Sequence, residues 1–100
     1  MTGGIPNEKW ERILALFRKH PAITEVILYG SRANGNFHDG SDIDLALKGE
    51  KLSSLEVNQI TLAYEDLYFL WKLDLILYET ISNPDLKSHI DRVGKSFPLA

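Results

Sequence analysis

Three short apolar runs, each as long as a β-strand, constrain the fold more than any other feature of the sequence. The runs are "ITEVILYG", "DIDLALK" and "KLDLILYE", which begin at residues 23, 42 and 72. They are rich in β-branched residues or leucine and end at glycine or charged residues, which is typical of strands. Apolar side chains occur on both faces of these runs, so we expect one sheet against which helices pack.

Helical patterns surround these runs. Residues 7–19 predict an amphipathic helix with Asn7 as its N-cap and one apolar face formed by Trp10, Ile13, Leu14 and Phe17. Ser53 and Glu56 have the spacing of a capping box, and a helix to about residue 71 follows. A last helix opens at residues 82–84 and stops at Gly94. The predicted order is α-β-β-α-β-α, an α/β (α+β) fold with a small mixed sheet flanked by helices.

Length and composition limit the class of protein. With 100 residues, the chain is expected to form a single domain over residues 1–100, without a second substrate-binding module. The formal net charge of −3 gives no electrostatic basis for binding nucleic acid, so we expect none. The absence of cysteine excludes disulfides and thiol chemistry and fits a reducing compartment. No signal peptide and no apolar run near the roughly 20 residues of a membrane span are present, so we expect a cytoplasmic protein without a membrane partner.

Two aspartates stand where the second apolar run begins. Side chains two apart in a strand share a face, so Asp42 and Asp44 should project together, where their charges repel. Asp74 lies between apolar residues in the third run and joins the same patch if the two strands are neighbours. Solvent, basic partners, a raised pKa or metal ions would each offset the repulsion. Three carboxylates on a rigid sheet suit Mg²⁺ or Mn²⁺, and two such ions about 3.5–4 Å apart fit phosphoryl or nucleotidyl transfer.

The first run ends in Gly30 and Ser31, which offer the features of a phosphate site. A glycine after a strand lets the backbone approach a ligand, and successive loop amides can form a concave anion site. Ser31 adds a hydroxyl donor, and Arg32 adds a planar cation that suits phosphate oxygens. Phosphate donors and metal ligands thus lie close together in the sequence, as a metal-bound nucleoside triphosphate requires.

The same residues also have simpler interpretations. An Asp-x-Asp pair on an edge strand can be solvated and can discourage aggregation, but the apolar flanks, the third acid and the Gly-Ser loop together favour a site. The positions of glycine and glutamate around "DGSDID" exclude an EF-hand loop. We expect residues 34–36 to form a turn, and we expect three other polar residues at the surface: His38, Lys48 and His89.

The stretch "YGSRANG", followed by "SDIDLAL", resembles the minimal nucleotidyltransferases of bacteria and archaea, within the superfamily typified by DNA polymerase beta. The resemblance covers most of the chain, from Val26 to about Gly94, and implies the polymerase beta-like fold. It also implies roles for six residues: a triphosphate site at Gly30, Ser31 and Arg32, and two divalent ions at Asp42, Asp44 and Asp74. Asp74 is expected to help activate the acceptor hydroxyl as well. Asn34 stands where many relatives carry arginine, so one phosphate contact is expected to be missing.

The function implied by the resemblance is transfer of a nucleoside monophosphate, AMP, from Mg-ATP to a hydroxyl acceptor. Members of this family are typically paired with a small helical HEPN protein, and some act as antitoxins that modify a tyrosine of that partner. We therefore expect a HEPN-type partner for this chain. A non-catalytic, nucleotide-binding or inhibitory subunit of a HEPN complex is the alternative. A free-standing enzyme acting on a small molecule is disfavoured by the short length.

A second apolar stripe on the helix predicted from residue 54 independently suggests a partner. Leu55, Leu62 and Phe69 recur seven residues apart, although a helix that packs on one side of a sheet needs only one stripe. The stripe either forms an exposed patch for another chain or widens the buried face beneath the terminal segment "KSFPLA".

Overall fold

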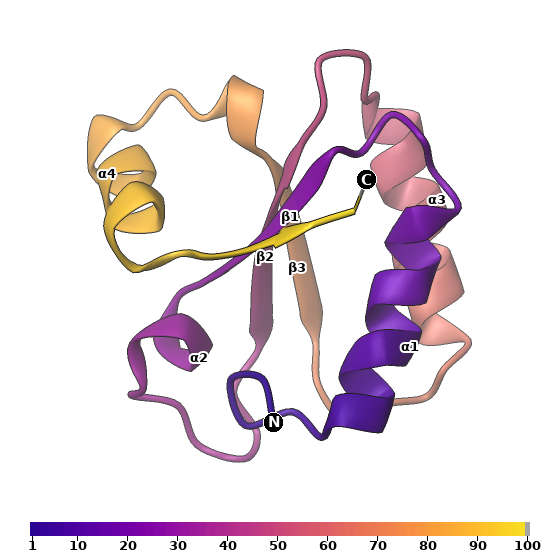
Figure 1. Cartoon of the computed structure of the whole chain (residues 1–100), viewed down its shortest axis with the longest axis vertical. Coiled ribbons are helices and arrows are strands. Elements are labelled where there is room, and N and C mark those ends of the chain that lie inside the picture. The colour runs from indigo at the N-terminus through magenta and orange to yellow at the C-terminus, as the bar shows by residue number, and fades with distance from the viewer. Residues whose placement is uncertain (100) are drawn as a thin grey trace.

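One four-stranded sheet organises the computed structural model, which describes residues 1–99 (Figure 1). Its strands are β1 (Glu25–Tyr29), β2 (Ile43–Lys48), β3 (Leu73–Leu77) and β4 (Lys95–Pro98). They lie in the order β3-β2-β1-β4. The helices are α1 (Asn7–Arg18), the short α2 (Ser31–Asn34), α3 (Ser54–Glu65) and α4 (Pro84–Val93), and a 3-10 turn, η1 (Tyr78–Thr80), follows β3. The mixed sheet flanked by helices confirms the predicted fold class.

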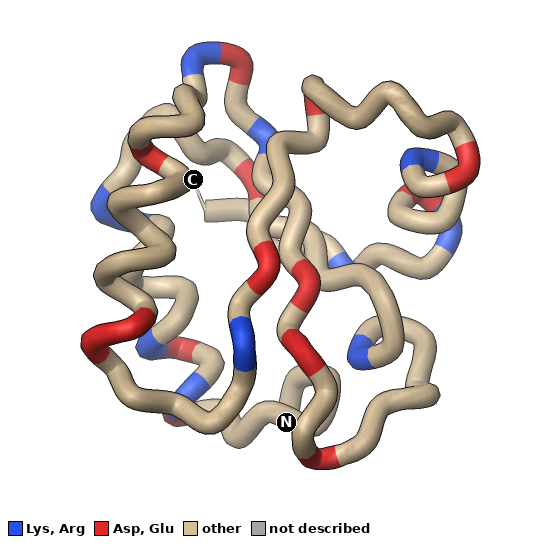
Figure 2. Tube along the Cα trace, turned by 180° about the vertical axis from the view of Figure 1, so that it is seen from behind, with Lys and Arg blue, Asp and Glu red and all other residues tan. Residues whose placement is uncertain are grey.

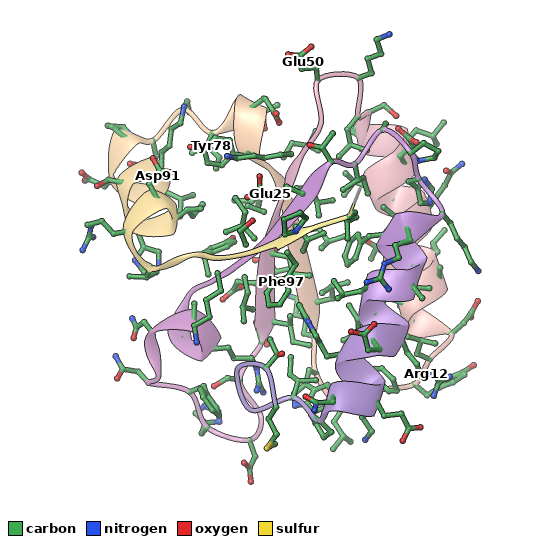
Figure 3. All side chains as sticks on the ribbon, viewed as in Figure 1. Arg12, Glu25, Glu50, Tyr78, Asp91 and Phe97 are labelled. Carbon is green, nitrogen blue, oxygen red and sulfur yellow. The ribbon has the colours of Figure 1, made fainter. Side chains whose placement is uncertain are left out.

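Helices cover both faces of the sheet, with α1 and α3 on one face and α4 on the other (Figure 1). The main core lies under α1 and α3 and takes alternate residues of the strands: Val26, Leu28, Ile43, Leu45 and Leu47. A smaller cluster lies under α4: Ile27, Tyr29, Ala46 and Ile90. Phe97 of β4 points into the main core, where its ring packs edge to face on Trp10 at 5.0 Å (Figure 3). None of the helices formed by residues 1–99 is long and apolar enough to cross a membrane.

Strand directions decide which residues meet across the sheet. β1 is antiparallel to both β2 and β4, whereas β2 and β3 are parallel because α3 forms the connection between them. The predicted order of elements omitted β4. Its sequence, "KSFP", has one large apolar side chain and no alternation, so its extended conformation depends on pairing with β1.

Two helix boundaries differ from the prediction. α3 ends at Glu65 rather than near residue 71, and Tyr68 has a φ of 54°, which takes the chain out of the helix. Trp71 is nevertheless buried, because the chain leads from this turn directly into β3. α1 begins at Asn7 itself, with Pro6 in the N-cap position, so Asn7 is not the cap. The capping box at the start of α3 is present as predicted.

The second apolar stripe of α3 divides between surface and core. Leu55 and Leu62 are 65% and 64% exposed. Phe69 lies beyond the end of the helix and packs edge to face against Tyr64 and Trp71. The terminal segment pairs with β1 as β4 rather than widening a buried face over the two leucines. Leu55 and Leu62 are therefore exposed rather than part of a wider buried face, and a chain that covers them stays a prediction.

Candidate active site

The three predicted aspartates gather on the side of β2 and β3 that faces away from the main core. Asp44 is the direct neighbour of Asp74 in the parallel register, at the spacing of about 4.8 Å that separates adjacent strands. Asp42 precedes β2 by one residue, and its charge acts on Asp44 from the same face. In Figure 2, acidic positions of the two strands accordingly lie side by side. The structure thus brings together the three carboxylates that the sequence pattern singled out.

These carboxylates repel one another. Burial raises the pKa of Asp44, the charges of Asp74 and Asp42 raise it further, and His89 acts in the opposite direction. Asp44 is half-buried, whereas Asp42 and Asp74 are exposed. Within the described part of the chain, no lysine or arginine forms an ion pair with any of the three. A cation bound here would relieve a repulsion that the protein itself leaves in place.

Gly30 joins β1 to α2 directly beside Asp44. Its φ of 73° and ψ of −155° lie in a region that only glycine adopts readily. A Cβ at this position would collide with the Asp44 carboxylate. The first backbone hydrogen bonds of α2 are donated by residues 33–34 to the Gly30 carbonyl, so the preceding amides of Ser31 and Arg32 have no partner within the helix. The turn therefore offers amide donors next to the acidic cluster.

Tyr29 and His89 lie next to the acidic cluster, although the sequence did not predict them as part of the site. Tyr29 is buried and lies opposite Asp44 in the antiparallel register, and burial, Asp44 and Asp74 raise the pKa of its phenol to about 12. His89 of α4 is half-buried and lies edge to face with Tyr29 at 6.3 Å. From the sequence, His89 is expected at the surface. A signal existed, because residue 89 is three positions after Leu86 and adjoins Ile90, so it flanks the apolar stripe of α4.

Arg32 lies differently from what a phosphate ligand requires. Its side chain is 2% exposed, and its guanidinium donates hydrogen bonds to the carbonyl oxygens of Gly3, Asp39 and Ser41. Ser31, in contrast, is half-buried at the start of α2. The structure therefore brings Gly30 against Asp44, with Ser31 next to it in the chain, and turns the Arg32 guanidinium toward the loop before Asp42. Asn34 and His38 are both exposed.

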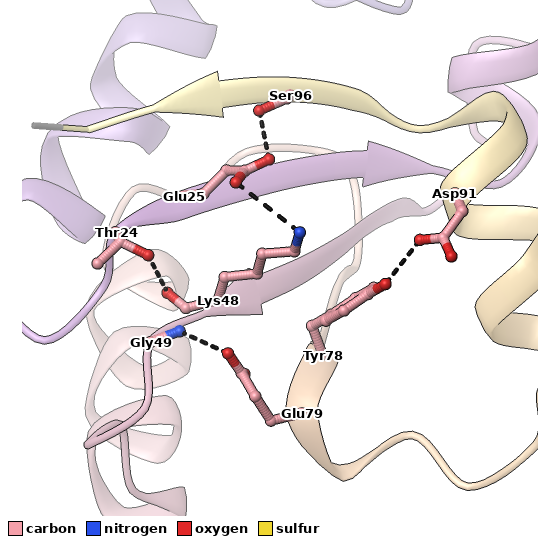
Figure 4. Close-up of polar contacts among 8 residues, drawn as sticks. All are labelled: Thr24, Glu25, Lys48, Gly49, Tyr78, Glu79, Asp91 and Ser96. Atoms are coloured by element: carbon pink, nitrogen blue, oxygen red, sulfur yellow. Dashed lines mark hydrogen bonds and ion pairs between the residues drawn. The ribbon is translucent and has the colours of Figure 1, made fainter.

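A second polar cluster lies at the other end of the same strands (Figure 4). Lys48 Nζ lies 4.0 Å from a carboxylate oxygen of Glu25, whose other oxygen accepts a hydrogen bond from Ser96. The Tyr78 hydroxyl donates to Asp91 at 2.7 Å, and Lys48 lies over the Tyr78 ring. A hollow of about 440 Å³ opens beside Lys48. Because opposite charges and matched donors satisfy one another here, the acidic cluster remains the stronger candidate.

The donor set of the acidic cluster fits a divalent cation. Carboxylate oxygens are the ligands that Mg²⁺ and Mn²⁺ prefer, and the pKa of Asp44 is raised by burial and then by the charges of Asp74 and Asp42. As the side chains of residues 1–99 are placed, no group of three or more histidine, aspartate or glutamate residues could hold a metal ion. Side chains of the cluster would therefore have to turn toward a bound ion.

Known proteins resemble this chain in sequence family and in fold. The family model described as "Polymerase beta, Nucleotidyltransferase" matches residues 11–97. A toxin–antitoxin structure with AMP-PNP shares 24% identity and a TM-score of 0.72, over 91% of this chain and 72% of that chain. A structure of the MntA–HpeT toxin–antitoxin shares 20% identity and a TM-score of 0.70, over 86% of this chain and 69% of that chain. The structure of the tri-AMPylated Shewanella oneidensis HEPN toxin in complex with MNT antitoxin shares 19% identity and a TM-score of 0.64, over 86% of this chain and 66% of that chain. No curated protein matches the chain.

The family match spans β1, β2, β3 and all of β4 except Pro98, and it includes every residue of the acidic cluster and the glycine turn. The solved structures share the fold at low sequence identity. The chain therefore belongs to the polymerase beta family of nucleotidyltransferases.

Proposed function

We propose that this chain binds Mg-ATP and transfers AMP to a hydroxyl group of a protein partner. One observation carries the proposal: the parallel register sets Asp44 beside Asp74, with Asp42 on the same face and Gly30 against the Asp44 carboxylate. Membership of a nucleotidyltransferase family supports the class of reaction.

The glycine turn binds the triphosphate. The glycine-only conformation of Gly30 lets the backbone come close to a phosphate group, and the Ser31 amide and hydroxyl donate hydrogen bonds to phosphate oxygens. This side of the site lies between the end of β1 and the start of α2, so the donor nucleotide reaches the carboxylates of β2 directly.

Asp42, Asp44 and Asp74 hold the divalent ions. When bound, the ions neutralise negative charge on the triphosphate and on the pyrophosphate as it leaves. A carboxylate oxygen of Asp74 accepts the proton of the acceptor hydroxyl. The acceptor oxygen then bonds to the α-phosphorus, while the bond between that phosphorus and the bridging oxygen of the pyrophosphate breaks. Tyr29, with its pKa raised to about 12, stays protonated at neutral pH and adds no further negative charge.

The acceptor that we propose is a tyrosine of a HEPN-type protein in the cytoplasm. One similar structure contains a tri-AMPylated HEPN toxin with its MNT antitoxin, and another contains AMP-PNP. By analogy, this chain acts as an antitoxin that modifies its partner. The exposed Leu55 and Leu62 of α3 give it an apolar surface on which a partner can dock.

The test combines the chain with the HEPN-type protein encoded beside it, Mg²⁺ and ATP labelled at the α-phosphate. Intact mass of both chains should show a gain of AMP on the partner. Asp42→Asn and Asp44→Asn should each lower the transfer rate by about 10²–10³-fold or more, because each removes a charge that the metal needs. Asp66→Asn, an exposed acid at the end of α3, is the matched control and should transfer normally.

The possible outcomes separate the two candidate functions. Undiminished transfer by Asp42→Asn or Asp44→Asn contradicts the site assignment. Binding of ATP without transfer by the unchanged chain instead supports the inhibitory, nucleotide-binding subunit.

A further inference from the structure

Arg32 is a buried charge, and the carboxylates of Asp39 and Asp42 act on it only from beyond ion-pair distance. Its side chain is 2% exposed, and no carboxylate within residues 1–99 forms an ion pair with it. Its nitrogen atoms instead donate to three backbone carbonyls: Nε and Nη2 to Ser41 at 3.0 and 2.8 Å, Nη2 to Asp39 at 3.2 Å, and Nη1 to Gly3 at 2.7 Å. A planar guanidinium can make this fork of bonds, whereas the single ammonium of lysine cannot.

Aromatic rings cover the guanidinium. The ring centroids of Phe37 and Trp71 lie 5.3 and 5.5 Å from the Arg32 guanidinium carbon. Trp71 also donates its indole N–H to the Asp39 carbonyl at 2.9 Å, the same carbonyl that Arg32 contacts. Two side chains from separate parts of the sequence therefore hold one loop, residues 39–41.

This loop leads directly into the acidic cluster. Ser41, which accepts two hydrogen bonds from Arg32, precedes Asp42, and its amide donates to His38 to close a turn. Trp71 lies shortly before β3, the strand that carries Asp74. Arg32 itself follows the phosphate-binding turn. One buried side chain thus connects the turn, the loop before Asp42 and the approach to Asp74.

We propose that Arg32 is a positioning residue that fixes Asp42 for metal binding through Ser41 and Asp39, and that it does not bind phosphate. This inference rests on the proposed function and deepens it. Movement of the guanidinium to a triphosphate would break four hydrogen bonds and leave the carbonyls of Gly3 and Ser41 without these donors. The Arg32 guanidinium therefore acts on the site through buried hydrogen bonds to the loop before Asp42.

The test measures Mn²⁺ binding by electron paramagnetic resonance on the full chain without nucleotide. Arg32→Lys and Trp71→Phe should each weaken Mn²⁺ affinity by about 10-fold, the lower end of the effect of removing an outer contact of a metal site. Trp71→Phe keeps a ring over Arg32 and removes only the bond to Asp39. Both variants should also show faster amide exchange in residues 38–42.

Two substitutions of the same chemical type serve as controls. Arg18→Lys changes an exposed arginine that pairs with Glu11, and Trp10→Phe removes an indole N–H that has no hydrogen-bond partner within residues 1–99. Neither should alter Mn²⁺ affinity.

The results distinguish three possibilities. Unchanged Mn²⁺ affinity in folded Arg32→Lys and Trp71→Phe overturns the positioning role, and a loss of ATP affinity confined to Arg32→Lys points to a phosphate contact. Should Arg32→Lys fail to fold, Trp71→Phe decides alone. If Asp42→Asn itself leaves Mn²⁺ affinity unchanged, the proposed function fails rather than the role of Arg32.

Discussion

The face of the sheet that α4 covers has polar side chains at both ends, on the same strands. The two ends differ in whether these side chains pair with one another. At one end, Glu25 pairs with Lys48 and Ser96, and Tyr78 pairs with Asp91. At the other end, Asp42, Asp44 and Asp74 lie close together, and none of them forms an ion pair with a lysine, arginine or histidine among the described residues. Where polar groups satisfy each other, the chain needs no ligand. Where like charges are held together without an ion pair, a cation from outside the chain would stabilise them.

The largest predicted effect tests how closely the glycine turn is fitted to the acidic end. Gly30→Ala should lower the free energy of unfolding by about 3 kcal/mol, since it combines a strained backbone conformation with a collision against Asp44. Chemical denaturation measures the change. Gly35→Ala is the matched control, because Gly35 also has positive φ but open space for a Cβ, and it should lose only about 1 kcal/mol. Equal losses for the two variants would contradict the close contact.

A divalent cation should stabilise the acidic end alone. At ten times its dissociation constant, Mg²⁺ should raise the free energy of unfolding by about 1.4 kcal/mol, because it binds the folded chain. Thermal unfolding with and without EDTA detects this gain. Asp44→Asn should remove most of the gain, whereas Glu25→Gln, at the paired end, should retain it.

Without metal, removal of a charge from the acidic end should stabilise the fold by less than Mg²⁺ does. The pKa of Asp44 is raised above its ordinary 3.8, so its ionised form is disfavoured in the folded state, and stability falls as pH rises through the raised pKa. In EDTA at neutral pH, Asp44→Asn should therefore melt at a higher temperature than the unchanged chain. The difference in melting temperature should shrink below pH 3.8, because Asp44 is then mostly protonated and residue 44 is neutral in both the unchanged chain and Asp44→Asn. A lower melting temperature at neutral pH would show that Asp44 is not repelled.

The smallest effect is expected at the paired end. Lys48→Gln should change the free energy of unfolding by less than about 1 kcal/mol, because its ion pair with Glu25 is partly exposed and long at 4.0 Å. Transfer of AMP should not change. A large loss of transfer in Lys48→Gln would remove the contrast between the two ends.

The strand pattern of the sequence predicted the core of this fold and the acidic cluster. Alternation fixed the faces of "DIDLALK" and "KLDLILYE", and the parallel pairing of β2 and β3 then brought Asp74 to Asp44. β4 was not predicted because its extended conformation depends on pairing with β1 rather than on its own residues. The end of α3 was not predicted because Leu67 and Trp71 continue the helical spacing, although the helix ends at Glu65 and Tyr68 then turns the chain.

The surroundings of Arg32 could not be predicted from its local sequence. The carbonyls that it contacts belong to residues 3, 39 and 41, and the rings over it belong to residues 37 and 71. Sequence position next to Gly-Ser suggested a phosphate ligand, whereas burial depends on contacts that only the folded chain brings together. His89 joined the site in the same way, through the packing of α4 on Tyr29.

The strand order has a consequence for what this chain can modify. β3 is the outermost strand, so the carboxylate of Asp74 stands on the rim of the sheet rather than between two strands. A rim sets no upper limit on the bulk of an incoming molecule, since only its hydroxyl must reach the reacting phosphorus. In the proposed transfer, selectivity on such a rim would come from how two large surfaces align, and a protein as large as this chain could serve as the acceptor.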